Sequence, residues 1–477
     1  MGSSHGIPRG ETNLSLLLDV NPEFLHIRNI VTSDGQQWPF SPGNIQNALT
    51  HIGAGGAVYL PAGSITESFT ILKEQALYGR GFDQTIITAE PGSSGIVIQD
   101  YATPAYDMVI MKGLQVIPAA NQDGILCTAG TADYRTPVLD LDLAFSGGNN
   151  PANYMLNLEN PMTHGSRINF RTVGAISHSG VRLFSDHTTI SPGNIHFPTF
   201  YAGLANVNDL IALHLQAHDH ALSLCKFDFF KVSGTVAATG QIALQLELDA
   251  AGDASRGIQY NRFEMLDLEG IDKAIYLLRG DLGWNIRENH FVGGYIGSSD
   301  TGFENTAVNP GKNFVEGLEF ITTADISDLG GTVFTDISKW PTTVAIGATS
   351  ELNPVMSFFY GMNANLAFGN TKYLYPGSLG NTMAADNLQI PITRDAYLRR
   401  IFVRSTNTLN ANTVFTVMDD GGASALTCTL GAGVDEGDAT GLVAMSAGDR
   451  LSVQIDTTAS GAGQISNLTV TLEFCVI

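Results

Sequence analysis

The chain has 477 residues, too many for one small core and enough for two or three folded units. Hydrophobic residues make up 44% and charged residues 15%, which is typical of a globular protein and excludes an intrinsically disordered one. With 24 Lys and Arg against 46 Asp and Glu, the net charge of −22 argues against nucleic acid as a partner and against loose association with anionic membranes, and no apolar run is long enough to predict a membrane-spanning helix.

Residues 1–10 have the composition of a cloning remnant, and residues 11–43 are expected to form an N-terminal arm. The first predicted element is a helix over Asn44–Ile52, NIQNALTHI, because its apolar residues recur at helical spacing on one face. A glycine-rich stop follows at Gly53–Gly56.

Short β-type runs then recur along the chain, each with an apolar anchor residue. Consecutive anchors are 27 to 36 residues apart, and they are Leu114, Leu141, Ile168, Ile195, Phe227, Phe263, Phe291 and Leu318. A unit of this length holds two or three short strands and cannot bury its apolar face alone, so it has to stack on copies of itself. The repeat therefore predicts an all-β parallel solenoid with the anchors as its core.

The segment Asn44–Thr88 resembles the opening of right-handed parallel β-helix proteins of the pectate-lyase-like superfamily. The resemblance rests on the short helix, the pair Gly55-Gly56, the strand and turn Val58–Gly63 and the turn Gly79-Arg80-Gly81. With the coils that follow it covers residues 44–340, and among such proteins the chain is most similar to bacteriophage tailspikes. This resemblance implies a homotrimer, a place in the virion tail or outside the cell, and a polysaccharide as partner.

The repeat fades after Trp340-Pro341, where residues 341–372 are expected to form a linker. From residue 373 to 477 the pattern is a meander of alternating strands separated by Ser, Gly, Asn and Asp turns, which predicts a C-terminal β-sandwich or jelly roll. The expected strands are Tyr397–Arg404, Thr413–Met418, Ala425–Leu430, Arg450–Ile455 and Asn467–Val476. Such a unit would cap the exposed end of the solenoid and hold the trimer together.

The outward positions beside the anchors form the main candidate site. Residues at one position of successive coils lie about 4.8 Å apart, so these positions predict a charged strip suited to a long sugar chain. We expect its substrate-binding members to be Asp142, Arg167, Asn169, His196, Lys226, Arg262 and His290.

Asp228 and Glu264 are the candidate catalytic pair of this strip. They fall on adjacent coils with an expected carboxyl separation of about 5 Å, near that of retaining glycosidases. Stacked like charges raise the pKa of one member, which would give one acid and one base or nucleophile, while Lys226 and Arg262 steady developing charge. The alternative is that Lys226–Asp228 and Arg262–Glu264 are ion pairs on a solvated face.

A second outward face is expected on the other run of strands. Its members are Asn157, Arg182, His214, Gln245 and Tyr276. Glu247 adjoins this face, is a further candidate substrate-binding residue, and makes an acidic cluster with Asp249 and Asp253. A hydrolase site there is an alternative to a solvated surface closed by a loop.

No metal site and no cofactor are expected. The cysteines Cys127, Cys225, Cys428 and Cys475 are far apart and contain no CxxC pair, which predicts small core residues. No P-loop, Rossmann fingerprint, HExxH or GxSxG sequence occurs in a supporting context.

The sequence thus favours a tailspike-like depolymerase that cleaves a bacterial surface polysaccharide. Hydrolysis is preferred over elimination because the carboxylate pair is well spaced and a charge of −22 repels polyuronates unless cations intervene. Two alternatives remain: a non-catalytic glycan-binding adhesin or structural tail protein, and a polysaccharide lyase.

Overall fold

The computed structural model describes the chain in segments. They are residues 28–72, 74–98, 108–127, 138–159, 165–185, 193–218, 221–235, 238–248, 257–279, 285–297, 300–306, 312–321, 324–341, 343–347, 350–353, 355–362, 366–367, 371–376, 389–393, 395–406, 412–457, 464–465 and 467–476. Two compact units account for them: one runs to Thr332 and includes Trp340–Val344, and the other comprises Val333–Lys339 and Ala345–Ile477.

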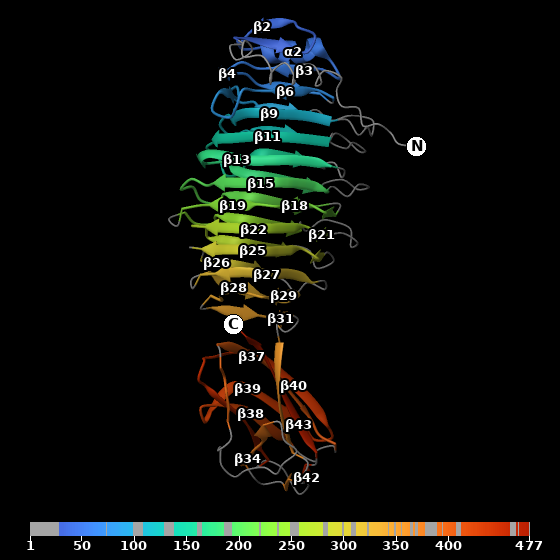
Figure 1. Cartoon of the computed structure of the whole chain (residues 1–477), viewed down its shortest axis with the longest axis vertical. Helices are drawn as coiled ribbons and strands as arrows, with labels where there is room; N and C mark the ends of the chain where they lie inside the picture. Colours follow the sequence, from blue (N-terminus) through green and yellow to red (C-terminus); the bar gives the residue numbers. More distant parts are fainter. Residues whose placement is uncertain are drawn as a thin grey trace, which may run out of the picture. The chain divides into compact units, whose positions relative to one another are not determined.

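Helix α2 (Asn44–Ile52) closes the first coil of the first unit, at the bounds that the sequence predicts (Figure 1). It lies near β1 (Asn29–Thr32), which pairs antiparallel with β2 (Gln37–Pro39) and β3 (Ala57–Tyr59). The carboxylate oxygens of Glu67 accept hydrogen bonds from the backbone N–H groups of Ile45 and Gln46, with N–O distances of 3.2 and 2.9 Å. A side chain from the first coil thus satisfies free donors at the helix N-terminus.

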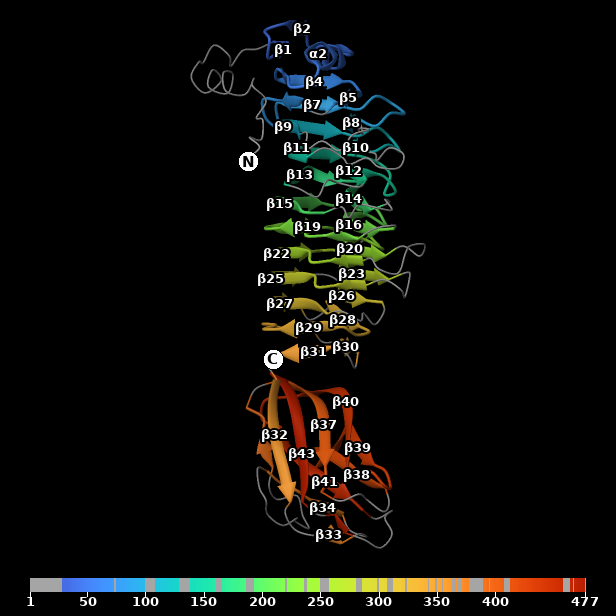
Figure 2. The same cartoon turned by 90° about the vertical axis from the view of Figure 1, so that its right-hand side faces the viewer.

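Two long sheets of parallel strands build the rest of the first unit (Figures 1 and 2). Sheet A continues from β3 through β4 (Gly63–Thr66), β6 (Ala76–Tyr78), β7 (Thr85–Thr88), β9 (Met108–Ile117), β11 (Val138–Gly147), β13 (Ser166–Ile176), β15 (Ile195–Gly203), β18 (Lys226–Phe227), β19 (Phe230–Ser233), β22 (Arg262–Glu269), β25 (His290–Gly297) and β27 (Asn313–Phe320). Sheet B contains β5 (Phe69–Ile71), β8 (Ile96–Ile98), β10 (Ile125–Cys127), β12 (Tyr154–Glu159), β14 (Ser179–Ser185), β16 (Ile211–Ala217), β20 (Ile242–Leu248), β23 (Lys273–Arg279), β26 (Thr301–Asn305) and β28 (Asp325–Asp328). A short sheet C joins β17 (Leu222–Ser223), β21 (Gly257–Gln259) and β24 (Asn285–Arg287). This is the predicted all-β parallel β-helix, which is confirmed.

Stacked phenylalanines fill the middle of the β-helix core. One column consists of Phe197, Phe227, Phe263 and Phe291, whose successive ring centroids are 4.5, 4.8 and 5.3 Å apart. All four side chains are fully buried. Because coils repeat at nearly the ring-stacking distance, one residue type per coil makes a continuous apolar column.

A ladder of buried asparagines lies at the start of three sheet A coils. The Nδ2 atom of Asn261 donates to Oδ1 of Asn289 at 2.9 Å, and Nδ2 of Asn289 donates to Oδ1 of Asn313 at 3.0 Å. Asn289 also donates to the carbonyl of Ile258, and Asn313 to that of Ile286, at 2.9 and 2.7 Å. The ladder therefore links the backbone of sheet C to the starts of three sheet A strands through buried hydrogen bonds.

Bulges change the predicted register in sheet A. Leu114 was expected beside Leu141, but it pairs with Leu143, because a register shift falls between Asp142 and Leu143. Gly113, with φ of +68°, is the extra residue on the facing strand. A one-residue insertion of this kind moves the whole following half-strand against its neighbour.

The predicted register is also wrong at two further coils, where the number of residues between paired strand positions differs from the spacing of the anchors. Ile195 pairs with Ser166 and not with Ile168, and Leu318 pairs with Gly294 and not with Phe291. All the predicted anchors are nevertheless buried, because inward positions recur at every second residue of a strand and each shifted anchor still occupies one of them.

The second unit is an antiparallel β-sandwich. Short strands β29 (Thr332–Thr335), β30 (Val344–Ile346) and β31 (Glu351–Asn353) precede it. One sheet has the order β35 (Tyr375–Pro376), β32 (Val355–Met362), β43 (Leu468–Val476), β37 (Ala396–Arg404), β40 (Glu436–Met445). The other contains β34 (Thr371–Tyr373), β41 (Arg450–Asp456), β38 (Thr413–Asp419) and β39 (Gly422–Leu430), with β36 (Ile390–Pro391) also paired to β41, and β33 (Leu366–Ala367) pairs with β42 (Gln464–Ile465).

The sandwich begins earlier in the chain than the sequence suggested. Residues Val355–Met362, expected within a linker, form β32 and pair along the whole of β43. The strand Glu436–Met445, which the sequence reading did not pick out, lies at the edge of the same sheet. All four cysteines are buried, and within the described residues none of them forms a disulfide. In the described part of the chain, no helix has the length and apolar character needed to cross a membrane.

Candidate functional site

A row of cationic and imidazole side chains follows sheet A over five consecutive coils. Register pairing places them one after another in the order Arg167, His196, Lys226, Arg262, His290. All five were predicted members of the strip. His196 was expected in the column of Asn169 and Asp228 and instead lies between Arg167 and Lys226. We use the name sheet A strip for these five residues together with Asp228 and Glu264.

Asp228 lies between two of these side chains. Its Oδ2 atom is 2.6 Å from Nε2 of His196, and its Oδ1 atom is 2.7 Å from the Lys226 ammonium. Partial burial raises the pKa of Asp228, but the contacts with Lys226 and His196 outweigh it and hold the pKa below its ordinary value. Asp228 is therefore ionised at neutral pH and does not serve as a proton donor.

Glu264 shares a cation with Asp228. The Lys226 ammonium is 3.8 Å from Oε2 of Glu264, and Nε of Arg262 donates to Oε1 of Glu264. One ammonium group thus contacts both carboxylates, which confirms that residues 36 positions apart in sequence become neighbours. The ion pairs Lys226–Asp228 and Arg262–Glu264, the alternative interpretation of these residues, are also present.

The remaining predicted strip residues are arranged differently. Asp142 lies 2.7 Å from a guanidinium nitrogen of Arg171, and it pairs in register with Asn169, which in turn pairs with Thr199. Asp142 and Asn169 therefore occupy a different outward column from the cationic row. At the other end of the row, Nδ1 of His290 is 3.3 Å from Oε1 of Glu316.

Exposed apolar side chains border the strip on both sides, and sequence reasoning missed them. Tyr260 is 49% exposed and precedes Arg262, while Phe229 and Met265 are 37% and 59% exposed and follow Asp228 and Glu264. Tyr260 and Met265 have left-handed backbone, with φ of 60° and 51°. Left-handed backbone positions are usually occupied by Gly or Asn. A large apolar residue at a turn between strands is therefore the feature of the sequence that could have indicated these exposed side chains.

The second outward face, on sheet B, has the predicted register throughout. Its members pair coil by coil in the order Asn157, Arg182, His214, Gln245, Tyr276. We call this row the sheet B column. No bulge interrupts these pairs, so the residues that the sequence placed at equivalent positions of successive coils are also neighbours in the sheet.

A hydrogen-bonded chain crosses the sheet B column. The hydroxyl of Tyr154 is 2.8 Å from Nδ1 of His214, and Nε2 of His214 is 2.8 Å from Oε2 of Glu247. Burial raises the pKa of Tyr154 to about 12, so the phenol stays protonated. Glu247, a predicted substrate-binding residue, belongs to this hydrogen-bonded chain. Asp249 and Asp253, the other members of the predicted acidic cluster, lie outside the described residues.

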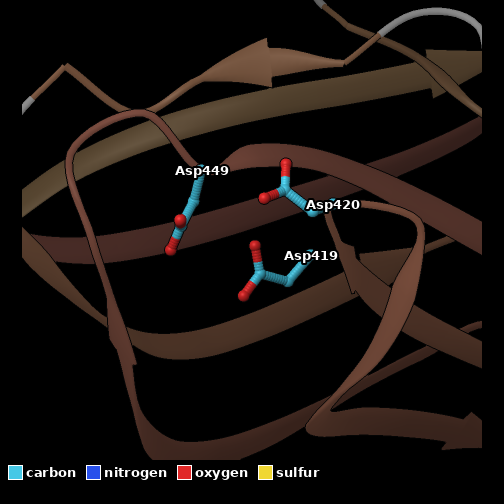
Figure 3. A group of neighbouring side chains, drawn as sticks. All are labelled: Asp419, Asp420 and Asp449. Carbon is cyan, nitrogen blue, oxygen red and sulfur yellow. The ribbon is translucent and has the colours of Figure 1, made fainter.

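Three carboxylates gather at turns of the second unit. The side chains of Asp419, Asp420 and Asp449 converge, with oxygens within 4.8 Å of one another (Figure 3). Burial and then the charges of Asp449 and Asp420 raise the pKa of Asp419. Asp420 accepts the backbone N–H of Arg450 at 3.1 Å and Asp449 accepts that of Ser446 at 2.6 Å, so turn geometry accounts for the positions of these two.

The strand pairing thus defines a parallel β-helix protein with a β-sandwich unit. No family model matches the sequence, and no curated protein does. Similar solved structures include the tailspike protein of Acinetobacter phage vB_ApiP_P1, with 10% identity, coverage of 87% of this chain and 81% of that chain, and a TM-score of 0.37. Tailspike protein gp49 of Acinetobacter baumannii bacteriophage Fri1, a capsular polysaccharide depolymerase, has 11% identity, coverage of 91% and 82%, and a TM-score of 0.24. The enzymatically active domain of tailspike protein 4 from bacteriophage CBA120 has 11% identity, coverage of 91% and 66%, and a TM-score of 0.28.

Proposed function

We propose that this chain is a tailspike-like protein that binds a bacterial surface polysaccharide along the sheet A strip and cleaves it. The observation that carries the proposal is the strip itself: charged and imidazole groups on consecutive coils, bordered by exposed aromatic and apolar side chains. The substrate class comes from the resemblance of residues 44–88 to the opening of β-helix proteins such as tailspikes.

The strip has the chemistry that a glycan needs. Its hydrogen-bonding groups recur about every 4.8 Å along the stack, so one extended chain can contact several coils. Tyr260 and Phe229 are half-exposed rings beside these groups, and apolar ring faces can pack on the carbon-bound hydrogens of a sugar. A sugar ring has hydroxyl groups at its edge and apolar C–H groups on its faces, so it can contact the polar groups and the aromatic rings of the strip together.

Cleavage by hydrolysis assigns different roles to the two carboxyls. Asp228, whose pKa lies below its ordinary value, acts as nucleophile or base, and Glu264 is the proton donor to the leaving oxygen. Lys226 lies 2.7 Å from one carboxylate and 3.8 Å from the other, so it is placed to stabilise charge that develops between them.

A second function, binding without cleavage, has a specific observation in its favour. Both carboxylates of the strip are already paired with cations of the same protein, as in a surface ion-pair network. A non-catalytic adhesin would use the same rings and charges to hold glycan and would release no product.

A degradation screen separates these two functions. The protein is incubated with a panel of bacterial capsular and lipopolysaccharide glycans, and products are analysed by mass and for new reducing ends or unsaturated sugars. Reducing ends that disappear in Asp228→Asn and Glu264→Gln, but persist in the control Asp267→Asn, support hydrolysis at the strip. The control removes a carboxylate paired with Lys231 at 2.5 Å on the same sheet, outside the strip. Binding that Tyr260→Ala weakens, without product from any glycan, supports the adhesin.

The assembly proposed for this function is a homotrimer in a virion tail, as the sequence resemblance implies. Light scattering tests it directly, since a trimer has three times the mass of the 50.8 kDa chain. A mass of one chain in solution would contradict it.

A further inference from the structure

The sheet B column contains polar groups that the proposed function leaves unused. Asn157, Arg182, His214 and Gln245 lie at the same outward position of four consecutive coils. Three coil steps separate the first from the last, which corresponds to about 14 Å along the stack. The column therefore offers a row of groups long enough for a short oligosaccharide.

Two buried amide oxygens in this column lack donors. Asn157 and Gln245 are only 6% and 5% exposed, and neither Oδ1 of Asn157 nor Oε1 of Gln245 has a hydrogen-bond partner among the described residues. Their amide nitrogens are engaged, because Nδ2 of Asn157 donates to Asp123 at 3.0 Å and Nε2 of Gln245 donates to Glu247 at 2.7 Å. Both side chains are thus fixed with an acceptor free, and a buried acceptor without a donor is unfavourable.

Arg182 lies between these two amides in the column and supplies a guanidinium group. Within the described parts of the chain, no acidic side chain approaches its guanidinium to ion-pair distance. Its Nε and Nη2 atoms both donate to Oε1 of Gln216, at 3.0 and 2.7 Å, and the guanidinium lies 4.0 Å from the ring centroid of Phe184. These bonds use two of the five N–H donors, so the group is oriented and keeps donors for an anion.

The neighbouring hydrogen-bonded chain is fully occupied and does not compete for such an anion. Nε2 of His214 is hydrogen-bonded to the carboxylate of Glu247, and Nδ1 of the same ring is hydrogen-bonded to the hydroxyl of Tyr154. Glu247 also receives the Gln245 amide and lies two coils from Arg182. Its carboxylate is hydrogen-bonded to His214 and Gln245, and Tyr154 and His214 act as positioning residues.

We propose that the sheet B column binds a carboxylate-bearing sugar, with the carboxylate on Arg182 and hydroxyl donors on Oδ1 of Asn157 and Oε1 of Gln245. The proposal rests on the proposed function only in taking a polysaccharide as the ligand, because it concerns a different sheet. It specifies the substrate class as a glycan that contains uronic or related acidic residues. The net charge of −22 does not prevent this, since charges beyond about 8 Å are screened at physiological salt while Arg182 contacts the ligand directly.

Other small ligands match the column less well. Inorganic phosphate or sulfate satisfies the guanidinium, but a fully ionised oxyanion cannot donate to two amide oxygens. A neutral sugar supplies hydroxyl donors and leaves the cation unpaired. A short oligosaccharide that carries a carboxylate offers an anion to Arg182 and hydroxyl donors to the amides on either side of it.

The test measures binding of tri- and tetrasaccharides of D-glucuronate or D-galacturonate by saturation-transfer NMR and calorimetry, because one monosaccharide is too short for a column of about 14 Å. Glucose and galactose oligosaccharides of the same length and acetate are the comparison probes. We expect at least one uronate to bind more tightly than its neutral counterpart and than acetate. Arg182→Gln should weaken that binding about 10- to 100-fold, the effect of losing a charge-assisted hydrogen bond. Gln245→Ala should weaken uronate binding without changing the weak binding of acetate.

The control is Arg287→Gln on sheet C. Nε of Arg287 donates to Oε1 of Gln259 at 3.1 Å, so it resembles Arg182 in its glutamine partner and lies outside the column. Uronate binding should be unchanged in this variant. Absence of uronate binding, or equal binding in Arg182→Gln and the parent protein, would overturn the inference.

Failure of this inference is distinguishable from failure of the proposed function. Uronate binding that Arg182→Gln abolishes and Asp228→Asn leaves intact supports the sheet B column, whether or not any polysaccharide is cleaved. Uronate binding that Asp228→Asn removes and Arg182→Gln does not would place the acidic sugar on the sheet A strip and overturn the inference.

Discussion

Asn289 holds the centre of the asparagine ladder, and its replacement by alanine is expected to destabilise the β-helix strongly. The side chain is fully buried and makes four hydrogen bonds. Nδ2 donates to the carbonyl of Ile258 and to Oδ1 of Asn313, and Oδ1 accepts from Nδ2 and the backbone N–H of Asn261. Asn313 keeps a second donor, the backbone N–H of residue 289, so three buried groups lose their principal partner.

The expected cost follows from those three groups. Each buried donor or acceptor that is left unsatisfied costs about 1–3 kcal/mol. The losses share one network and are not strictly additive, so the free energy of unfolding should fall by about 3–6 kcal/mol. Asn289→Asp retains the two acceptor contacts and loses both donor bonds, and it should be destabilising as well.

Urea unfolding followed by circular dichroism measures this change, with refolding curves to establish reversibility, or unfolding rates where refolding is incomplete. Asn150→Ala is the matched control, because Nδ2 of Asn150 donates to Oδ1 of Asn121 at 2.8 Å across one coil in an exposed position. Water replaces that bond, so the control should lose less than about 1 kcal/mol. Equal losses in Asn289→Ala and Asn150→Ala would refute the reasoning.

Three further predictions concern packing and charge. Phe227→Ala should cost about 3–5 kcal/mol in unfolding experiments, because the buried ring is stacked on both sides, whereas the exposed Phe229→Ala should cost much less; similar values would contradict the stacked core. The pKa of Asp34 should fall from 3.8 to about 2, because it accepts hydrogen bonds from Thr32 and His51, and a carboxyl NMR titration near 3.8 would disprove this. The folded-state pKa of Asp228 is depressed, so its contribution to the free energy of unfolding is present above its ordinary pKa and is lost as pH falls through the folded value. Asp228→Asn should therefore make the free energy of unfolding less dependent on pH in the acid range. An unchanged pH dependence would count against the ion pairs.

The sequence by itself determined the solenoid and much of its second face. Apolar residues at a nearly constant step cannot be buried within one coil, so stacking is forced, and the helix Asn44–Ile52 is encoded by its own periodicity and glycine stop. On sheet B, Arg182, His214 and Gln245 align as the sequence predicts, because no residue is inserted within the paired segments.

Only the tertiary structure decided the register of sheet A and the state of its charges. Because of the bulge at Gly113, Leu114 pairs with Leu143 and not with Leu141. The spacing of residues in the sequence does not show in which strand such an extra residue forms a bulge. The contact of Lys226 with both Asp228 and Glu264 depends on side-chain directions across two coils. Burial of the Gln245 oxygen likewise depends on what packs around it, because desolvation is a property of three-dimensional surroundings and is absent from local sequence.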